Sequence, residues 1–195
     1  ALPRADVLAL AASGFKPDQR RRFMLKAFLK SRSEKSLGAE ICAAIGARAR
    51  APVFFAELGV PDTIDGRFDL VVLHAWLVLA RLRELGMKDV SQGVVDSLFA
   101  SFDESLRDLG VGDIGIGHRM KKMADAFYGR LSAYGDAKDL DALKDAILRN
   151  VYRGAPGHDV QAARLARYAD DARALLGESD LSSGAVAFGP VPVIA

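Results

Sequence analysis

The longest apolar stretch of the chain predicts a buried central helix. From residue 70 to 80 every position is apolar except His74. This run is too short to cross a bilayer, which takes about 20 apolar residues, and too uniformly apolar for a helix with one exposed face. We therefore expect a helix over 65–86 that other helices surround. Asp65 is expected to cap its start, and Gly86 is expected to end it in the left-handed conformation.

The remaining apolar positions recur every three or four residues, which is the period of helices with one buried face. The helices expected from this spacing cover residues 17–31, 36–50, 91–109, 118–134, 139–152 and 159–176. No alternating run is long enough for a sheet. The predicted fold class is therefore all-α, a single compact bundle of about seven helices around the buried central helix.

The chain divides into three predicted parts. A basic N-terminal arm or amphipathic helix covers 1–35, a helical domain covers 36–178, and an extended tail covers 179–195. Glycine and proline residues keep the tail from continuing the last helix. Its Ala-Val-Ala-Phe run could lie across the helical domain.

Positive charge is concentrated in the arm. Residues 1–35 carry nine Lys or Arg and three Asp or Glu, while the net charge of the whole chain is +2. This composition suits a helix that lies on an anionic membrane, and RNA is the other anionic surface that it could contact. Two alternatives are a helix docked on the body with its basic side in solvent, and a cleavable targeting segment. The residues expected at the membrane surface are Lys26, Lys30, Arg32 and Lys35.

No pattern in the sequence indicates a catalytic or metal site. Gly110-x-Gly112-x-x-Gly115 has the spacing of a dinucleotide-binding loop, but it follows an expected helix instead of a strand. Gly112-x-x-x-x-Gly117 has P-loop spacing but lacks the lysine and hydroxyl residue that should follow. We expect these glycines to let the chain turn between two helices. The three histidines lie on separate segments, and the single cysteine, Cys42, is expected to be buried. The sequence therefore predicts a protein that is not an enzyme and has no cofactor.

Two residues of the central helix need separate interpretation. A lone histidine such as His74 is usually a hydrogen-bonded core residue, and the alternative is a polar floor in a groove that accepts a partner. Trp76 is expected to anchor the core, because burying an indole ring contributes strongly to stability.

Four longer motifs occupy the middle of the chain. They are a stretch over 49–82 that includes P-D-T-I-D-G-R-F-D-L, a stretch over 102–123 that includes G-V-G-D-I-G-I-G-H-R-M-K-K-M, A-F-Y-G-R-L-x-A-Y over 126–134, and R-N-V-Y-R-G over 149–154. Together they resemble the ubiquinol–cytochrome c chaperone family of the bacterial type, assembly factors for cytochrome b of respiratory complex III. The resemblance implies an all-helical, non-enzymatic protein that binds newly made cytochrome b. Because mitochondrial members also work at the ribosomal exit, it implies the ribosome as a further partner.

The resemblance is densest at the start of the central helix and around the glycine-rich link. A buried helix does not need charged residues at its mouth for packing, so a charged cluster there could orient a client. The alternative is that Asp65 only caps, that Arg67 pairs with Asp69 or Asp113, and that the lysines form a solvated face. The expected partner-binding residues are Asp65, Arg67, His74, Asp113, Arg119, Lys121, Lys122, Tyr128 and Arg130.

The leading hypothesis is a chaperone for cytochrome b in the assembly of ubiquinol–cytochrome c reductase, with peripheral contact to an anionic membrane and no contact with DNA. The second hypothesis is a membrane- or RNA-associated helical scaffold without chaperone activity. We expect neither a secretory signal nor a spanning helix. The expected location is the cytoplasm, peripherally on the inner membrane, or the matrix side of the membrane in a mitochondrion.

Overall fold

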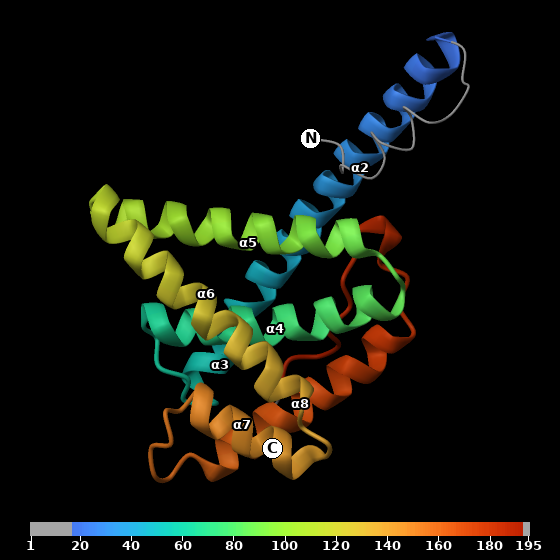
Figure 1. Ribbon diagram of the computed structural model, residues 1–195. Coiled ribbons are helices and arrows are strands. Elements are labelled where there is room, and N and C mark those ends of the chain that lie inside the picture. The colour runs from blue at the N-terminus through green and yellow to red at the C-terminus, as the bar shows by residue number, and fades with distance from the viewer. Residues whose placement is uncertain (1–16, 193–195) are drawn as a thin grey trace.

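Seven α-helices and no strand make up the described part of the chain, which confirms the predicted all-α class (Figure 1). The computed structural model describes the backbone of residues 17–192 and the side chains of 31–112 and 115–192. The helices are α2 (Pro17–Ala49), α3 (Pro52–Ala56), α4 (Ile64–Glu84), α5 (Lys88–Asp108), α6 (Asp113–Gly135), α7 (Leu140–Asn150) and α8 (Asp159–Gly177), followed by the 3₁₀ turn η1 (Leu181–Ser183).

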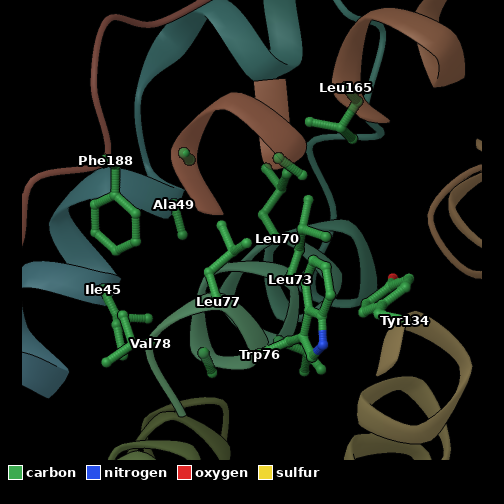
Figure 2. Packing of buried hydrophobic residues seen from close by; sticks show 14 of the residues in the cluster. Ile45, Ala49, Leu70, Leu73, Trp76, Leu77, Val78, Tyr134, Leu165 and Phe188 are labelled. Atoms are coloured by element: carbon green, nitrogen blue, oxygen red, sulfur yellow. The ribbon is translucent and has the colours of Figure 1, made fainter. Parts of the chain in front are cut away.

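The central position predicted for the apolar run is confirmed in α4. This helix packs against α2, α5, α6 and α8. Figure 2 shows side chains from α2, α6, α8 and the C-terminal segment converging on the side chains of α4, among them Leu73 and Leu77. Trp76 is 7% exposed, which confirms that it is a core residue.

Both ends of α4 follow from local chemistry, but one of them differs from the prediction. Thr63, and not Asp65, caps the start: its Oγ1 accepts a hydrogen bond from the Gly66 N–H at 3.1 Å. Asp65 lies within the first turn, because the helix begins one residue earlier than expected. A Cβ at Gly66 would overlap the Pro61 carbonyl, so glycine is required where the chain enters the helix. Gly86 ends the turn after α4 with φ +69°, as predicted.

The prediction of two separate helices over 17–31 and 36–50 is wrong, because α2 is continuous across them. Ser36 was expected to cap the second helix, but it lies inside α2 with its Oγ 3.5 Å from a carboxylate oxygen of Glu40. Serine favours caps without requiring one, and no proline interrupts the hydrogen-bonded ladder here. In Figure 1 the N-terminal half of α2 extends beyond the other helices. The helix therefore runs through residue 35, where the predicted arm meets the predicted helical domain.

The glycine-rich link is shorter than predicted. Gly115 and Gly117 lie inside α6, and Gly112 is its N-cap. Of the four glycines of the link, Gly110 alone has a positive φ, at +76°. A single residue in the left-handed conformation is enough to turn the chain. Glycine inside a helix lowers its stability by only about 1 kcal/mol relative to alanine, so Gly115 and Gly117 can be accommodated in α6. The turn between α5 and α6 therefore needs only one of the four.

The C-terminal segment lies across the helical body, which confirms the expectation for the Ala-Val-Ala-Phe run. Phe188 is 5% exposed, and its ring centroid is 5.1 Å from that of His74. Next to it, Arg48 donates a hydrogen bond from Nη2 to the Gly189 carbonyl at 2.6 Å. The segment thus covers the junction of α2 with α4.

Candidate functional site

An open apolar groove of about 440 Å³ lies between α2 and α5, and the beginning of α4 forms its floor. The floor is made by Phe68 and Val71, the α2 wall includes Ala39, Ala43 and Gly46, and the α5 wall includes Ser97, Ser101 and Ser105. Small residues therefore line both walls, and larger apolar side chains lie between them. Met123 of α6 adds one further apolar side chain to the lining.

The groove is a wedge that widens away from the point where α2 and α5 cross. The helices touch at Gly38 and Gly93, where a Cβ on Gly38 would lie 2.6 Å from the Gly93 carbonyl carbon. From this crossing the two helices separate (Figure 1). At the wide end Ile64 is 56% exposed and Leu109 is 55% exposed, and both line the groove. Contiguous exposed apolar surface of this kind marks interaction sites in soluble proteins.

Two arginines supply the charge of the groove. Arg50 and Arg67 line its wide end, and no Asp or Glu lies among its described lining residues. Arg67 pairs with Asp62 at 2.7 Å, and this pair lowers the pKa of the Asp62 carboxyl. The guanidinium of Arg67 also lies 5.9 Å from the ring centre of Phe55. Among the described residues no acid pairs with Arg50, so its charge is available to a ligand.

A buried ion-pair cluster holds the floor of the groove in place. Asp69 is fully buried next to Phe68, and its carboxylate lies 2.8 Å from Nη2 of Arg130 on α6 and 2.9 Å from Nη2 of Arg153. Burial raises the pKa of Asp69 to about 6, although the two arginines act in the opposite direction. Arg153 also lies 3.8 Å from Asp65. The cluster therefore joins the start of α4 to α6 and to the segment after α7.

The backbone of Arg153 is itself unusual. Its φ of +56° lies in the left-handed region that residues with a side chain rarely adopt. In this conformation its Nη1 donates a hydrogen bond to the Asn150 carbonyl at 2.9 Å, while Nη2 reaches Asp69. One side chain thus caps the end of α7 and neutralises the buried carboxylate, which gives the R-N-V-Y-R-G motif a structural role.

On the other side of α4, His74 belongs to a buried network and the expectation that it binds a partner is wrong. Its Nδ1 donates to the Leu70 carbonyl at 2.7 Å, because a carbonyl can only accept. Its Nε2 therefore accepts from the Tyr168 hydroxyl at 2.9 Å, and that oxygen accepts from Nε of Arg48 at 2.8 Å. Burial lowers the pKa of His74 to about 4, so the ring is neutral at physiological pH. His74 is therefore a hydrogen-bonded core residue, which is the first of the two interpretations given for it.

The other predicted partner residues fall into separate groups. Asp65 and Arg67 are exposed at the start of α4, and Tyr128 is 56% exposed on α6. Arg130 is mostly buried and is committed to Asp69, so its role is structural. Arg67 pairs with Asp62, whereas Asp69, one of the partners in the alternative interpretation, pairs with Arg130 and Arg153.

The remaining predicted residues are cations on α2 and α6. Arg119, Lys121 and Lys122 are exposed on α6, and Arg32 and Lys35 are exposed on α2. The side chains of Asp113, Lys26 and Lys30 lie outside the described residues. None of the described ion pairs joins Arg119, Lys121 or Lys122 to the start of α4. The described members of the predicted cluster are therefore divided between the start of α4 and α6.

The groove itself was not predicted. A signal for it exists in the sequence, since Ala39, Ala43 and Gly46 recur on one face of α2, and three serines recur at every fourth position of α5. Small residues in such rows permit the close approach of another helix. Neither row alone shows that the two helices separate.

Comparison with known proteins decides the family. The sequence model described as ubiquinol-cytochrome C chaperone matches residues 56–187, which is more than half of the chain. The chain belongs to the ubiquinol-cytochrome C chaperone family. A crystal structure of the Cbp3 homolog from Brucella abortus superposes with a TM-score of 0.74 at 36% sequence identity, covering 86% of this chain and 97% of that one. The Brucella abortus homolog therefore provides an experimental structure with the same fold as this chain.

Two curated relatives agree with this assignment. Ubiquinol-cytochrome-c reductase complex assembly factor 1 of Xenopus laevis is 26% identical over 102 residues, which are 50% of this chain and 51% of that protein. Protein CBP3, mitochondrial, of Saccharomyces cerevisiae is 28% identical over 117 residues, or 56% and 35% of the two chains. The matched region thus spans about half or less of the relatives' length. None of the helices in residues 17–192 combines the length and apolarity that crossing a membrane requires.

Proposed function

We propose that this member of the ubiquinol-cytochrome C chaperone family is a non-enzymatic assembly factor for ubiquinol–cytochrome c reductase, and that it holds newly made cytochrome b. Family membership supports the first part, because relatives carry the name of assembly factors for that complex. The observation that carries the second part is the open apolar groove between α2, α4 and α5. A chaperone for a membrane protein needs such a surface.

Physical chemistry links the groove to this client. Apolar segments of a membrane protein that have not yet been inserted expose surface that water disfavours by roughly 25 cal/mol per Å². Phe68 and Val71 on the floor, with Ile64 and Leu109 at the wide end, offer matching apolar surface. The groove would shield one face of a client segment and release it without any covalent chemistry.

Exposed cations support a peripheral location. Arg32 and Lys35 are exposed on α2 near its crossing with α5, and Arg119, Lys121 and Lys122 are exposed on α6. Basic side chains near an anionic lipid surface contribute about 1 kcal/mol each. We place the protein at the cytoplasmic face of the inner membrane of a bacterium, or at the matrix face in a mitochondrion. The same cations would suit ribosomal RNA, and the predicted roles of Asp65, Arg67 and Tyr128 belong to this proposal.

One matched pair of variants tests the groove. Ala43 and Ala47 are both exposed on α2, one helical turn apart, but only Ala43 lines the groove. Ala43→Arg should reduce crosslinking to newly made cytochrome b, in membranes that carry complex III, by about tenfold or more. Ala47→Arg should leave it unchanged.

Thermal melts of both variants provide the control, since arginine at an exposed helical position alters stability little. A folded Ala43→Arg variant with undiminished crosslinking would rule the groove out as the client site. Loss of crosslinking in both folded variants would instead show that added charge anywhere on α2 interferes, which also contradicts the proposal.

A further inference from the structure

We infer that the groove selects one kind of segment, an apolar α-helix flanked by an acidic residue, with the acid placed at Arg50 and Arg67. This inference rests on the proposed function, because it names the chemistry of the client that the groove would hold. Three properties of the groove lead to it: the backbone of its walls, the size of its side chains and the position of its charge.

The walls favour a helix over an extended segment. An extended client would bring a row of unpaired backbone N–H and C=O groups into an apolar site, where each needs a partner. The walls and floor are formed by α2, α4 and α5, with Met123 of α6 beside them, and the backbone groups of these helices are paired inside the helices. Beyond the two arginines at the wide end, the serine hydroxyls of α5 are the polar groups of the lining that could pair with an extended chain, and Ser105 already donates to the Ser101 carbonyl. A helical client satisfies its own backbone and needs no such partners.

The side chains of the walls fit the outside of a helix. Ala39, Ala43 and Gly46 form a row of small residues on α2, and Ser97 and Ser101 begin a similar row on α5. Rows of small residues let a neighbouring helix approach closely, so that its larger side chains can reach the floor. The α2 wall runs from Ala39 to Arg50 in the described structure, which corresponds to about 17 Å or roughly three helical turns. That is enough for one face of a short helix.

The charge of the groove is of one sign and at one end. Arg50 ends the α2 wall and Arg67 lies in the first turn of α4, both at the wide end. Of the two, Arg67 already pairs with Asp62, while Arg50 has no acidic partner among the described residues. An apolar segment that enters the groove would place its flanking residue beside Arg50. A carboxylate at that position would be attracted, and a lysine would be repelled.

The test uses two synthetic peptides and the whole 195-residue chain. Each peptide carries twelve leucine and alanine residues in a helical pattern and a fluorescent label; one ends in two glutamates and the other in two lysines. Binding is followed by fluorescence anisotropy. The glutamate peptide should bind about tenfold more tightly than the lysine peptide at low salt, and the difference should shrink in high salt.

Arg50→Glu should reverse this order of affinities. The control is Arg149→Glu, which changes another exposed arginine near the end of a helix, at α7, and does not line the groove. Both changes place an acid near a helix C-terminus, so any general loss of stability is matched. The control should keep the preference of the parent protein for the glutamate peptide.

The outcomes separate this inference from the proposed function. Equal binding of the two peptides, or an unchanged preference in Arg50→Glu, overturns the charge selection while leaving an apolar client site intact. Failure of both peptides to bind overturns the inference together with the groove as the client site. Reversal in Arg149→Glu as well would mean that net charge, and not Arg50, sets the preference.

Discussion

The two faces of α2 carry arginines only two residues apart, yet their surroundings differ. On the covered face, Arg48 donates to the Tyr168 hydroxyl at 2.8 Å and to the Gly189 carbonyl at 2.6 Å, so it ties α2 to α8 and to the C-terminal segment. On the open face, Arg50 lines the groove next to Gly46 and has no acidic partner among the described residues. The covered face uses a large polar side chain to lock the fold, whereas the open face has small side chains and free charge.

The same contrast runs around α4. On one side His74 is fully enclosed by Tyr168 and Phe188, and every nitrogen of its ring has a partner. On the other side Phe68 and Val71 border the groove, and Asp69 with its two arginines holds them in position. The ion pairs of Asp69 with Arg130 and Arg153 therefore fix the position of an apolar surface that stays open to solvent. A site for a transient partner needs a surface that is both fixed and open.

The largest expected difference between the two sides is in packing. Trp76→Ala should lower the free energy of unfolding by about 3–5 kcal/mol, because Trp76 is 7% exposed and its removal leaves a cavity. Ile64→Ala, at a position that is 56% exposed in the mouth of the groove, should change it by less than about 1 kcal/mol. Urea unfolding of both variants measures this. Similar losses would mean that the groove is part of the stabilising core.

The second difference is a pH dependence of stability, which we expect from Asp69 beneath the open side of α4. The pKa of Asp69 is raised from 3.8 to about 6 in the folded protein, so folding takes up a proton between these values. The stability contributed by this group is complete below about pH 4 and is lost as the pH rises through 6, by about 3 kcal/mol. Asp69→Asn removes the titration, so its stability relative to the parent should rise over this interval.

Urea midpoints of the parent and of Asp69→Asn, taken from pH 4 to 7.5, provide this comparison. Because both proteins share their other titrating groups, those contributions cancel in the difference. A difference that is flat, or that falls with increasing pH, would show that Arg130 and Arg153 keep the carboxylate charged throughout.

A smaller effect distinguishes the two arginines of α2. Arg48→Ala leaves the Tyr168 hydroxyl and the Gly189 carbonyl without their donor, which should cost about 1–3 kcal/mol. Arg50→Ala removes an exposed side chain without an ion pair among the described residues, and should change stability by about 0.5 kcal/mol or less. Thermal melts can rank the variants, and equal shifts would contradict the distinction between a covered and an open face.

Much of the fold could be read from the sequence because it depends on local signals. The apolar run around His74 indicated a surrounded helix, and Gly86 ended it as expected. The continuity of α2 could not be read, because Ser36 is compatible with a cap and with a helix interior alike. In the structure, the continuous α2 packs against α5 where Gly38 meets Gly93.

The site was less accessible to sequence reasoning for a physical reason. A groove is the space that several helices leave between them, and Ala43, Val71 and Ser101 come from three segments whose relative angles no local pattern specifies. The partners of Asp69 are likewise distant, since Arg153 follows it by more than 80 positions. Asp69 was expected only as a possible partner of Arg67, and its pairing with Arg130 and Arg153 was not predicted.

The most direct test of the central claim is a photocrosslink from inside the groove. A photoreactive amino acid in place of Ser101 lies in the α5 wall, while the same probe in place of the neighbouring Ala100 is exposed outside the groove. During synthesis of cytochrome b in membranes that carry complex III, the probe at 101 should crosslink to the new chain and the probe at 100 should not. Crosslinks of equal strength from both positions, or from 100 alone, would contradict the account.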